Sequence, residues 1–261
     1  MEFSWKLAFH SGMSAKSDLR AAVDEGVPVG VVATLLDLSK VYLTLPRHLD
    51  NGGAAFVDSG AFAAFQKGET VNWDRVFQVY ESILMMTSKP EGLSIVAPDV
   101  IGDQAATLEL WARHAVRVGN WIAAGARVIV PLQCGALNAD QLLDAAKEIF
   151  GTERFSAGIP SNLAAMGVED TATLHHSDFH ILGRVVLTED LREKLGALLA
   201  NNPFAIYTSD ANWLRSRLGA ISRAKAETAP NPSSNPMDSS RTRAVREVLR
   251  VDAYQYKQRD S

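Results

Sequence analysis

Cysteine is almost absent from this chain, and its scarcity limits the sites that the chain can build. Of 261 residues only Cys134 is a cysteine, so no internal disulfide can form and no multi-cysteine zinc site can be assembled. Neither a GxGxxG fingerprint nor a Walker motif occurs, which argues against a dinucleotide or a nucleoside triphosphate. The sequence therefore predicts neither a bound metal nor another cofactor.

Long apolar runs and an excess of basic charge are also missing. No apolar stretch approaches the roughly 20 residues that span a bilayer, and the opening "MEFSWKLAFH" lacks the features of a secretory signal. We therefore expect a cytoplasmic protein that makes no membrane contact. The net charge of −4 argues against non-specific coating of long nucleic acid, but leaves room for a local basic surface that touches a few phosphates.

Short runs rich in Val, Ile, Ala and Phe recur along the chain, each followed by a polar residue or glycine and then by a stretch with helical spacing. This pattern is typical of βα units around a parallel sheet. The expected strands are eight, at 5–11, 28–34, 54–60, 93–99, 127–133, 154–160, 179–184 and 204–210. Eight units favour a closed (β/α)8 barrel over an open doubly wound sheet. The sequence predicts an α/β protein, a single-domain (β/α)8 TIM barrel over residues 1–222.

The segments between and after these strands differ in character. Amphipathic spacing predicts helices at 73–85, 107–122, 139–150 and 189–199, whereas 34–54 is longer and less regular. Residues 223–240 are dense in Pro, Ser and Asn and predict a flexible linker. Residues 241–261 resume helical spacing with many basic side chains. This tail is interpreted as a helix packed on the barrel wall, with a nucleic-acid contact as the alternative.

Carboxylates and glycines gather where the expected strands end, which is where barrels of this kind carry their catalytic groups. In chain order these ends hold Asp58, Asp99, Gln133, Gly158, Gly183 and Asp210. A single aspartate at such a position can simply cap the next helix. Three carboxylates at one rim, beside glycines that let a ligand approach the backbone, favour a binding or catalytic site.

This set of side chains suits the Watson–Crick edge of a guanine-like base. Carboxylates accept hydrogen bonds from N1 and N2 of the base, and O6 accepts from an amide such as that of Gln133. Phe62 and Leu182 are placed to close on the two faces of a flat ring, as in pockets for extruded nucleobases. An ordinary core aromatic is the alternative for Phe62.

Several short motifs, in one order over residues 54–214, resemble those of the tRNA-guanine transglycosylase superfamily. "DSGAF" resembles its DSGGF motif, "VPLQCG" its apolar run followed by QG, "SAGIP" its glycine-pair strand and "HILGR" its L-M-G segment. "TSDANW" falls where that family places its nucleophilic aspartate, and is similar to the form found in archaeal and DNA-modifying members. The resemblance implies an enzyme that exchanges guanine in a polynucleotide for a 7-deazaguanine.

The resemblance also implies roles for individual residues. Asp210 would attack the ribosyl C1′ carbon and Asp58 would transfer a proton, while Asp99 would bind the purine edge. The remaining implied contacts to the base are Ser59, Phe62, Gln133, Gly135, Gly158, Leu182 and Gly183. Independently of the family, displacing a base from a sugar passes through an oxocarbenium-like state that a carboxylate can stabilise and then capture.

Departures from the family pattern direct the interpretation to one branch. The cysteine cluster that holds zinc in the tRNA enzymes and the helical extension after the nucleophile are both missing here, and Ala61 and Ile159 replace glycines of two motifs. These differences favour the branch that inserts 7-cyano-7-deazaguanine into DNA, with tRNA as the other polynucleotide and with a possible helper protein.

Two other functions stay open on the sequence alone. One is a nucleosidase that acts on a free 7-deazaguanine nucleoside, and the other is a non-catalytic barrel that binds a base or a partner. A metal site is a further possibility, because His175, His176 and His180 lie close together in the sequence. We instead interpret these histidines as part of a solvated loop before the seventh strand.

Overall fold

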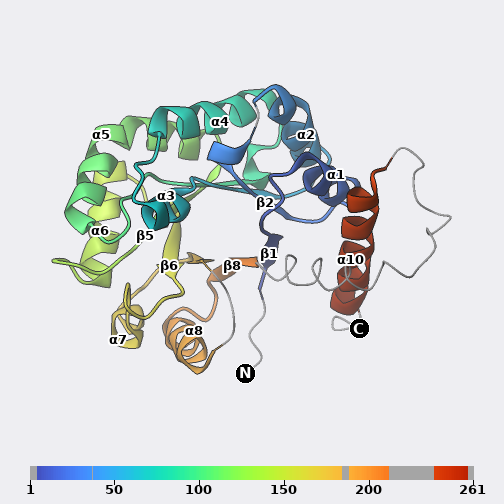
Figure 1. Cartoon of the computed structure of the whole chain (residues 1–261). Coiled ribbons are helices and arrows are strands. Elements are labelled where there is room, and N and C mark those ends of the chain that lie inside the picture. The colour runs from blue at the N-terminus through green and yellow to red at the C-terminus, as the bar shows by residue number, and fades with distance from the viewer. Residues whose placement is uncertain (1–4, 37, 184–187, 212–237, 258–261) are drawn as a thin grey trace.

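Eight parallel strands close into one barrel in chain order, with β8 hydrogen-bonded to β1. The computed structural model describes residues 5–36, 38–183, 188–211 and 238–257 (Figure 1). The strands are β1 (Leu7–His10), β2 (Val29–Val32), β3 (Ala55–Asp58), β4 (Leu93–Val96), β5 (Arg127–Pro131), β6 (Ser156–Pro160), β7 (Asp178–Leu182) and β8 (Ile206–Ala211). Each overlaps one of the eight predicted runs, so the predicted single-domain (β/α)8 barrel is confirmed.

Helices lie outside the strands and connect them (Figure 1). They are α1 (Lys16–Asp24), α2 (Leu38–Asp50), α3 (Ala61–Lys67), α4 (Trp73–Met86), α5 (Gln104–Ala123), α6 (Ala139–Phe150), α7 (Val168–Ala172), α8 (Glu189–Asn201) and α10 (Ser240–Lys257), with 3₁₀ turns η1 (Ala33–Leu35) and η2 (Pro90–Gly92). The four predicted helices are confirmed as α4, α5, α6 and α8. The segment that we expected to be irregular, 34–54, contains the helix α2, which buries Leu45 and Leu49 completely.

Alternation along each strand divides the apolar residues into two layers. Outward positions such as Val57, Val128 and Val130 pack beneath the helices in the large core. Inward positions form a small cluster in the barrel centre, built from Phe9, Phe56, Val96 and Ile129. Since side chains of a strand alternate between its faces, Asp58 lies on the same inward face as Phe56, one layer closer to the carboxyl end.

The basic C-terminal helix α10 packs against α1 (Figure 1). Its apolar residues Val245, Val248 and Leu249 are buried. Three of its arginines form ion pairs with acidic side chains. Arg241 pairs with Asp18, Arg250 pairs with Glu25, and Arg246 pairs with Asp24, Glu25 and Asp238. The positive charge of these three arginines is therefore directed at the protein's own acidic groups.

Two sequence predictions concern parts of the chain that the structure describes only in part. The predicted linker 223–240 lies outside the described residues except for its last three positions, and the last four residues of the predicted tail also lie outside them. No helix in the described part is both long and apolar enough to cross a membrane.

Candidate active site

Asp58 ends β3 and is held in a tight turn. Its Oδ1 accepts a hydrogen bond of 2.9 Å from the N–H of Gly60, and Gly60 has a φ of 86°, which favours glycine. A Cβ there would also come within 2.8 Å of Thr34 Oγ1. The next helix, α3, begins at Ala61, and its N-cap residue is Gly60, which has no side chain to cap it. Asp58 is therefore not the cap of that helix, and the turn fixes its carboxyl at the barrel rim.

Asp99 lies three residues beyond β4, in the loop that leads into α5. It is not the cap of α5 either, because that position is taken by Asp103, whose side chain accepts from the N–H of Ala106. The carboxyl of Asp99 is nonetheless buried, with only 5% of the residue exposed. The structure thus removes the helix-capping explanation for both aspartates.

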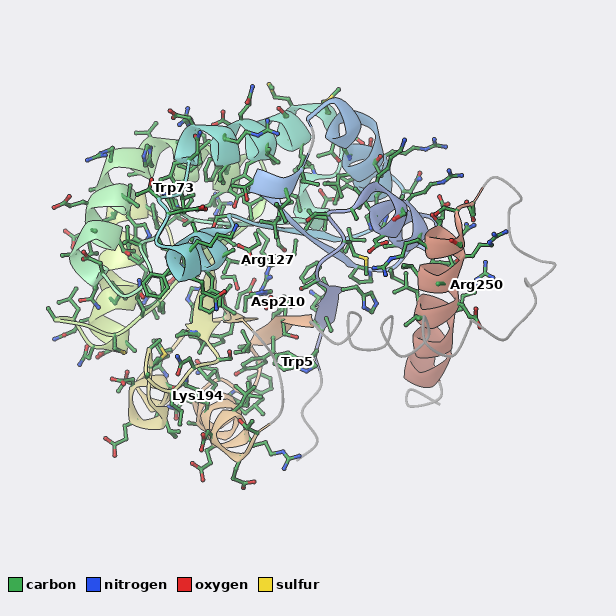
Figure 2. The ribbon with its side chains drawn as sticks, in the orientation of Figure 1. Trp5, Trp73, Arg127, Lys194, Asp210 and Arg250 are labelled. Atoms are coloured by element: carbon green, nitrogen blue, oxygen red, sulfur yellow. The ribbon has the colours of Figure 1, made fainter. Side chains whose placement is uncertain are left out.

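Asp210 lies near the end of β8 and completes the group of three. In the register of the sheet it is opposite Phe9 of β1, and its side chain is only 15% exposed. The N–H groups of Gly183 and of Asp210 itself act on the carboxyl and lower its pKa. Gly183 follows the last residue of β7, so Asp210 is held between two neighbouring strands at the carboxyl end of the barrel (Figure 2).

The charge of Asp58 acts on both of the other carboxyls. Burial, together with the charge of Asp58, raises the pKa of Asp99 to about 7 and that of Asp210 to about 8. Burial also raises the pKa of Asp58, but the Gly60 N–H and Ser59 oppose this rise by stabilising the carboxylate. Two carboxyls close to a charged third thus retain protons near neutral pH, a pattern typical of sites that use carboxyl groups in chemistry.

His180 contradicts its sequence interpretation. We interpreted it as part of a solvated loop with His175 and His176, although it falls within the strand predicted at 179–184. The structure agrees with the strand, because His180 lies within β7 and is completely buried. Its imidazole stacks on Phe56 with 4.9 Å between ring centroids. Nδ1 is 2.8 Å from Thr208 Oγ1, and Nε2 is 4.0 Å from Asp210 Oδ1. The other two residues do precede β7, and His176 bonds to the carbonyl of Phe155 at 2.7 Å.

Gln133 contacts the loop that carries Asp99. Its Oε1 accepts from the Gly102 N–H at 2.8 Å and its Nε2 donates to the Val100 carbonyl at 2.7 Å. Thr107 supports the same loop through hydrogen bonds to the N–H and carbonyl of Val100. Both ends of the Gln133 amide are thus engaged in holding the loop, and the contact of this side chain with a base stays a prediction.

The remaining predicted residues fall into exposed and tightly packed positions. Phe62, on α3, is 59% exposed, so it is not the core aromatic considered as an alternative. Leu182 packs at the edge of the inner cluster, and a Cβ at Gly158 would come within 2.8 Å of it. Gly135 leaves space for the side chain of Gln104, which a Cβ would approach to 2.9 Å.

Ser59 also serves the turn after β3. It is almost completely buried, and its Oγ accepts a hydrogen bond of 3.2 Å from the N–H of Ala61. This bond fixes the start of α3 directly beside Asp58. A contact between Ser59 and substrate stays a prediction.

Beneath the inner aromatic cluster lies an ion pair that the sequence analysis did not anticipate. Arg127, at the start of β5, donates from Nε to Asp178 at the start of β7 over 2.8 Å, and from Nη2 to Ser156 at 2.8 Å. Burial and the charge of Arg127 keep the pKa of His180 well below its usual value. The barrel interior therefore holds His180 as a neutral imidazole between this pair and Asp210.

Tyr80 and Thr208 are further residues near the site that were missed. Tyr80, on α4, is completely buried, and its pKa is raised well above the usual value by burial and by the charges of Asp58 and Asp99. Strand alternation could have found Thr208 and His180, because Thr208 is two residues before Asp210 and His180 is two before Leu182. Tyr80 comes from a helix that carries no such signal.

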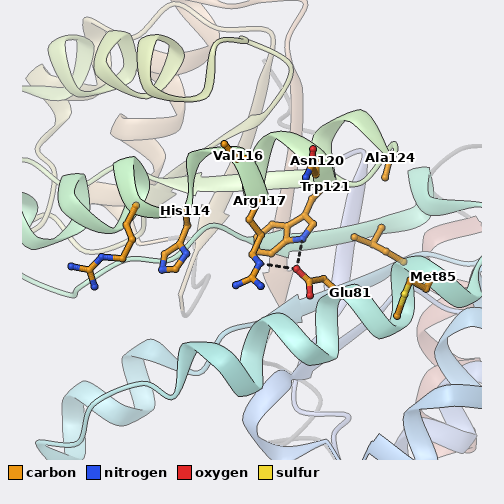
Figure 3. A pocket seen from close by; sticks show the side chains of 10 residues that line it. Glu81, Met85, His114, Val116, Arg117, Asn120, Trp121 and Ala124 are labelled. Atoms are coloured by element: carbon orange, nitrogen blue, oxygen red, sulfur yellow. Dashed lines mark hydrogen bonds and ion pairs between the residues drawn. The ribbon is translucent and has the colours of Figure 1, made fainter.

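A separate groove lies on the outer surface between α4 and α5 (Figure 3). It has a volume of about 540 Å³ and includes the exposed Met85 and Val116. Glu81 bonds there to Arg117 at 2.9 Å and accepts from Trp121 at 3.4 Å. This groove is formed by helix surfaces and not by the strand ends that hold the three aspartates.

The described residues include no group of three or more His, Cys, Asp or Glu side chains arranged to hold a metal ion. The prediction that the protein contains no zinc stays a prediction for metal analysis.

Comparison with known proteins identifies the fold. No family model and no curated protein matches this chain. A solved structure described as an L-ribulose 3-epimerase aligns with a TM-score of 0.51 and 15% identity, over 98% of this chain and 97% of that one. One described as a putative fructose-1,6-biphosphate aldolase from Coccidioides immitis aligns with a TM-score of 0.50 and 12% identity, over 94% and 87%. At such identities the likeness shows the fold alone, a single-domain (β/α)8 barrel.

Proposed function

We propose that this protein is a guanine transglycosylase that exchanges guanine in a polynucleotide, with DNA favoured over tRNA, for a 7-deazaguanine such as 7-cyano-7-deazaguanine. The observation that carries the proposal is the group of Asp58, Asp99 and Asp210 at the carboxyl end of the barrel. All three are largely buried, the charge of Asp58 raises the pKa of the other two, and neither α3 nor α5 uses Asp58 or Asp99 as its cap.

The proposed reaction begins with displacement of the base. As substrate binds, the proton that Asp210 holds at rest passes to Asp58. The Asp210 carboxylate then forms a bond to C1′ as the bond between C1′ and N9 of guanine breaks, and Asp58 gives this proton to the leaving base. The incoming 7-deazaguanine then attacks C1′ through N9, breaks the bond to Asp210 and returns its N9 proton to Asp58. Protons and bonds balance over the cycle, and two displacements retain the configuration of the sugar.

Recognition of the base falls to Asp99 and the residues around it. A carboxylate accepts two N–H donors of a guanine edge, and a pKa of about 7 lets Asp99 ionise when those donors arrive. The loop that bears Asp99 is held by Gln133, which limits the movement of the carboxyl. The exposed ring of Phe62 is available to cover one face of a base.

The deciding experiment is incubation of the purified chain with labelled guanine or labelled 7-cyano-7-deazaguanine and, in parallel, DNA, tRNA or a free nucleoside. Nucleoside analysis should find label in DNA. Label in tRNA alone would direct the activity to RNA, and release of base from a nucleoside without incorporation would favour a nucleosidase. Binding of base without turnover under every condition would favour an accessory barrel.

Two variants make this experiment specific to the site. Asp210→Asn keeps the shape of the side chain but cannot form the ester, so incorporation should fall by orders of magnitude. Asp144→Asn removes a carboxylate from the surface of α6, where its side chain is 75% exposed, and should leave incorporation unchanged. Rapid denaturation of the wild type with polynucleotide should trap a covalent adduct on the peptide that contains Asp210. An adduct on another peptide would refute this assignment.

A further inference from the structure

The imidazole of His180 lies one layer below the carboxyl of Asp210 inside the barrel. His180 is opposite Thr208 in the register of β7 and β8, and Asp210 follows Thr208 by two residues, on the same face of β8. Nε2 of the ring is 4.0 Å from Oδ1 of Asp210. Both atoms are buried, and neither has a hydrogen-bond partner within the described part of the chain.

The opposite nitrogen of the ring has a partner that can reverse its role. Nδ1 is 2.8 Å from Thr208 Oγ1, and this hydroxyl is 3.4 Å from the carbonyl of Phe179. A hydroxyl both donates and accepts. When it donates to the carbonyl, it accepts from Nδ1–H and Nε2 is left bare; when it donates to Nδ1, the proton of the ring is on Nε2.

We propose that His180 is a positioning residue for Asp210, a neutral imidazole that hydrogen bonds to the Asp210 carboxyl in both charge states by changing its tautomer. A bare Nε2 accepts from the protonated carboxyl, and Nε2–H donates to the carboxylate. The shift from 4.0 Å to a hydrogen-bond distance requires about 1 Å of side-chain movement. One proton leaves the pair for solvent or substrate when Asp210 ionises, and the ring stays neutral throughout.

The groups around this pair favour a neutral ring. Phe56 of β3 stacks on the imidazole and Phe9 of β1 lies 6.2 Å from it between ring centroids. The facing charged groups are Arg127 of β5, which is paired with Asp178 of β7, and Asp58 of β3. Arg127 opposes a positive charge on the ring and Asp58 opposes a negative charge on Asp210. A neutral donor at Nε2 would therefore stabilise the carboxylate in addition to the N–H groups of Gly183 and Asp210.

Nuclear magnetic resonance of the full chain with ¹⁵N-labelled histidine tests the tautomer change directly. Between pH 6 and pH 9.5 the ring proton of His180 should move from Nδ1 to Nε2 as Asp210, followed through ¹³C-labelled aspartate, loses its proton. His176 is the internal control, because its Nε2 bonds to the Phe155 carbonyl and should keep its proton throughout. A His180 ring that keeps one tautomer, or that becomes doubly protonated, would overturn the proposal.

A second measurement uses His180→Phe, which retains an aromatic ring against Phe56 but removes both nitrogens. The Asp210 titration midpoint should rise by about one pH unit, a roughly tenfold weaker ionisation, because the carboxylate loses a donor. An unchanged midpoint in a folded variant would refute the role, and if the variant does not fold, the wild-type tautomers decide.

The inference depends on the proposed function only for the chemistry assigned to Asp210. If base exchange is found, its rate should fall at a higher alkaline pH in His180→Phe than in the wild type, while the affinity for base is retained. A general loss at every pH would indicate a merely structural role. If no exchange is found with any substrate, the proposed function fails, but the tautomer experiment still decides whether His180 serves Asp210.

Discussion

Replacement of Asp210 by asparagine should make the protein more stable at alkaline pH, although it should abolish turnover. Burial and the charge of Asp58 raise the pKa of Asp210 from 3.8 to about 8. Below the lower value the carboxyl is protonated in both the folded and the unfolded chain. Between the two values the unfolded chain releases the proton and the folded chain keeps it, so the free energy of unfolding falls as the pH rises. An asparagine side chain stays neutral at every pH and escapes this loss.

The size of the effect follows from the width of this pH range. Each pH unit over which one proton is retained by the folded chain alone costs about 1.4 kcal/mol. The three units between pH 5 and pH 8 set an upper limit of about 4 kcal/mol for Asp210 taken alone. Because Asp58 and Asp99 share the same environment and titrate with it, we expect the variant to gain about 2 kcal/mol over the wild type between those pH values.

Urea unfolding at pH 5, 6, 7, 8 and 9, followed by circular dichroism, measures this difference. The gap between Asp210→Asn and the wild type should widen steadily up to about pH 8 and then stay constant, with equal urea dependence for both proteins. Asp144→Asn, on the exposed surface, should run parallel to the wild type. Parallel curves for Asp210→Asn as well would show that the Asp210 carboxyl is not held protonated by the fold.

Further expectations concern other groups of the same barrel. Asp99→Ala should weaken base binding by about 1–3 kcal/mol in calorimetry while the melting temperature changes little, since Asp99 caps no helix; normal binding with a much lower melting temperature would contradict this. The rate of exchange at low substrate should rise with pH through the pKa of Asp99, about 7, and fall above about 8, because Asp99 binds the base as a carboxylate whereas Asp210 and Asp58 must keep one proton between them for the leaving base; a rate that stays constant from pH 6 to pH 9 would contradict this protonation scheme. Arg127→Met should lower the free energy of unfolding by about 3–5 kcal/mol, because it leaves the partly buried Asp178 without its partner. Adding Asp178→Asn should restore part of this loss in urea unfolding; no recovery would show that the unpaired Asp178 carboxylate is not the cause of the loss. Metal analysis of the purified chain should find no stoichiometric zinc, because Cys134 is the only cysteine.

The fold could be predicted from the sequence because its signals are local and repeated. The strands are short runs rich in β-branched and apolar residues, and each of β1 to β7 is followed by a helix. The helix α2 was harder to predict from the sequence. This helix contains Pro46, which removes a backbone donor and weakens the pattern, although Leu45 and Leu49 bury on its inner side.

The candidate site could be predicted only where its residues end a strand or, like Asp99, follow a strand within a few residues. Asp58 and Asp210 belong to this class, since the parallel topology brings the ends of β3 and β8 to one rim. His180 was assigned to a polar loop because two other histidines precede it, although the predicted strand 179–184 included it. Its burial depends on Phe56, Phe9 and Thr208, which come from three other strands and which no local pattern connects with it.

The resting protonation of the site bears on why it would favour a charged transition state. Asp210 with a pKa of about 8 is mostly neutral at pH 7, so a neutral sugar and base can enter without facing a full negative charge. As positive charge develops at C1′, it favours the ionised carboxyl by Coulombic attraction, which is strong where water is excluded. The carboxylate is thus stabilised most in the state where the bond to the base is broken. Such a difference between ground state and transition state is what accelerates a reaction, and on the proposed function it is supplied by the same burial that makes Asp210 costly to the fold.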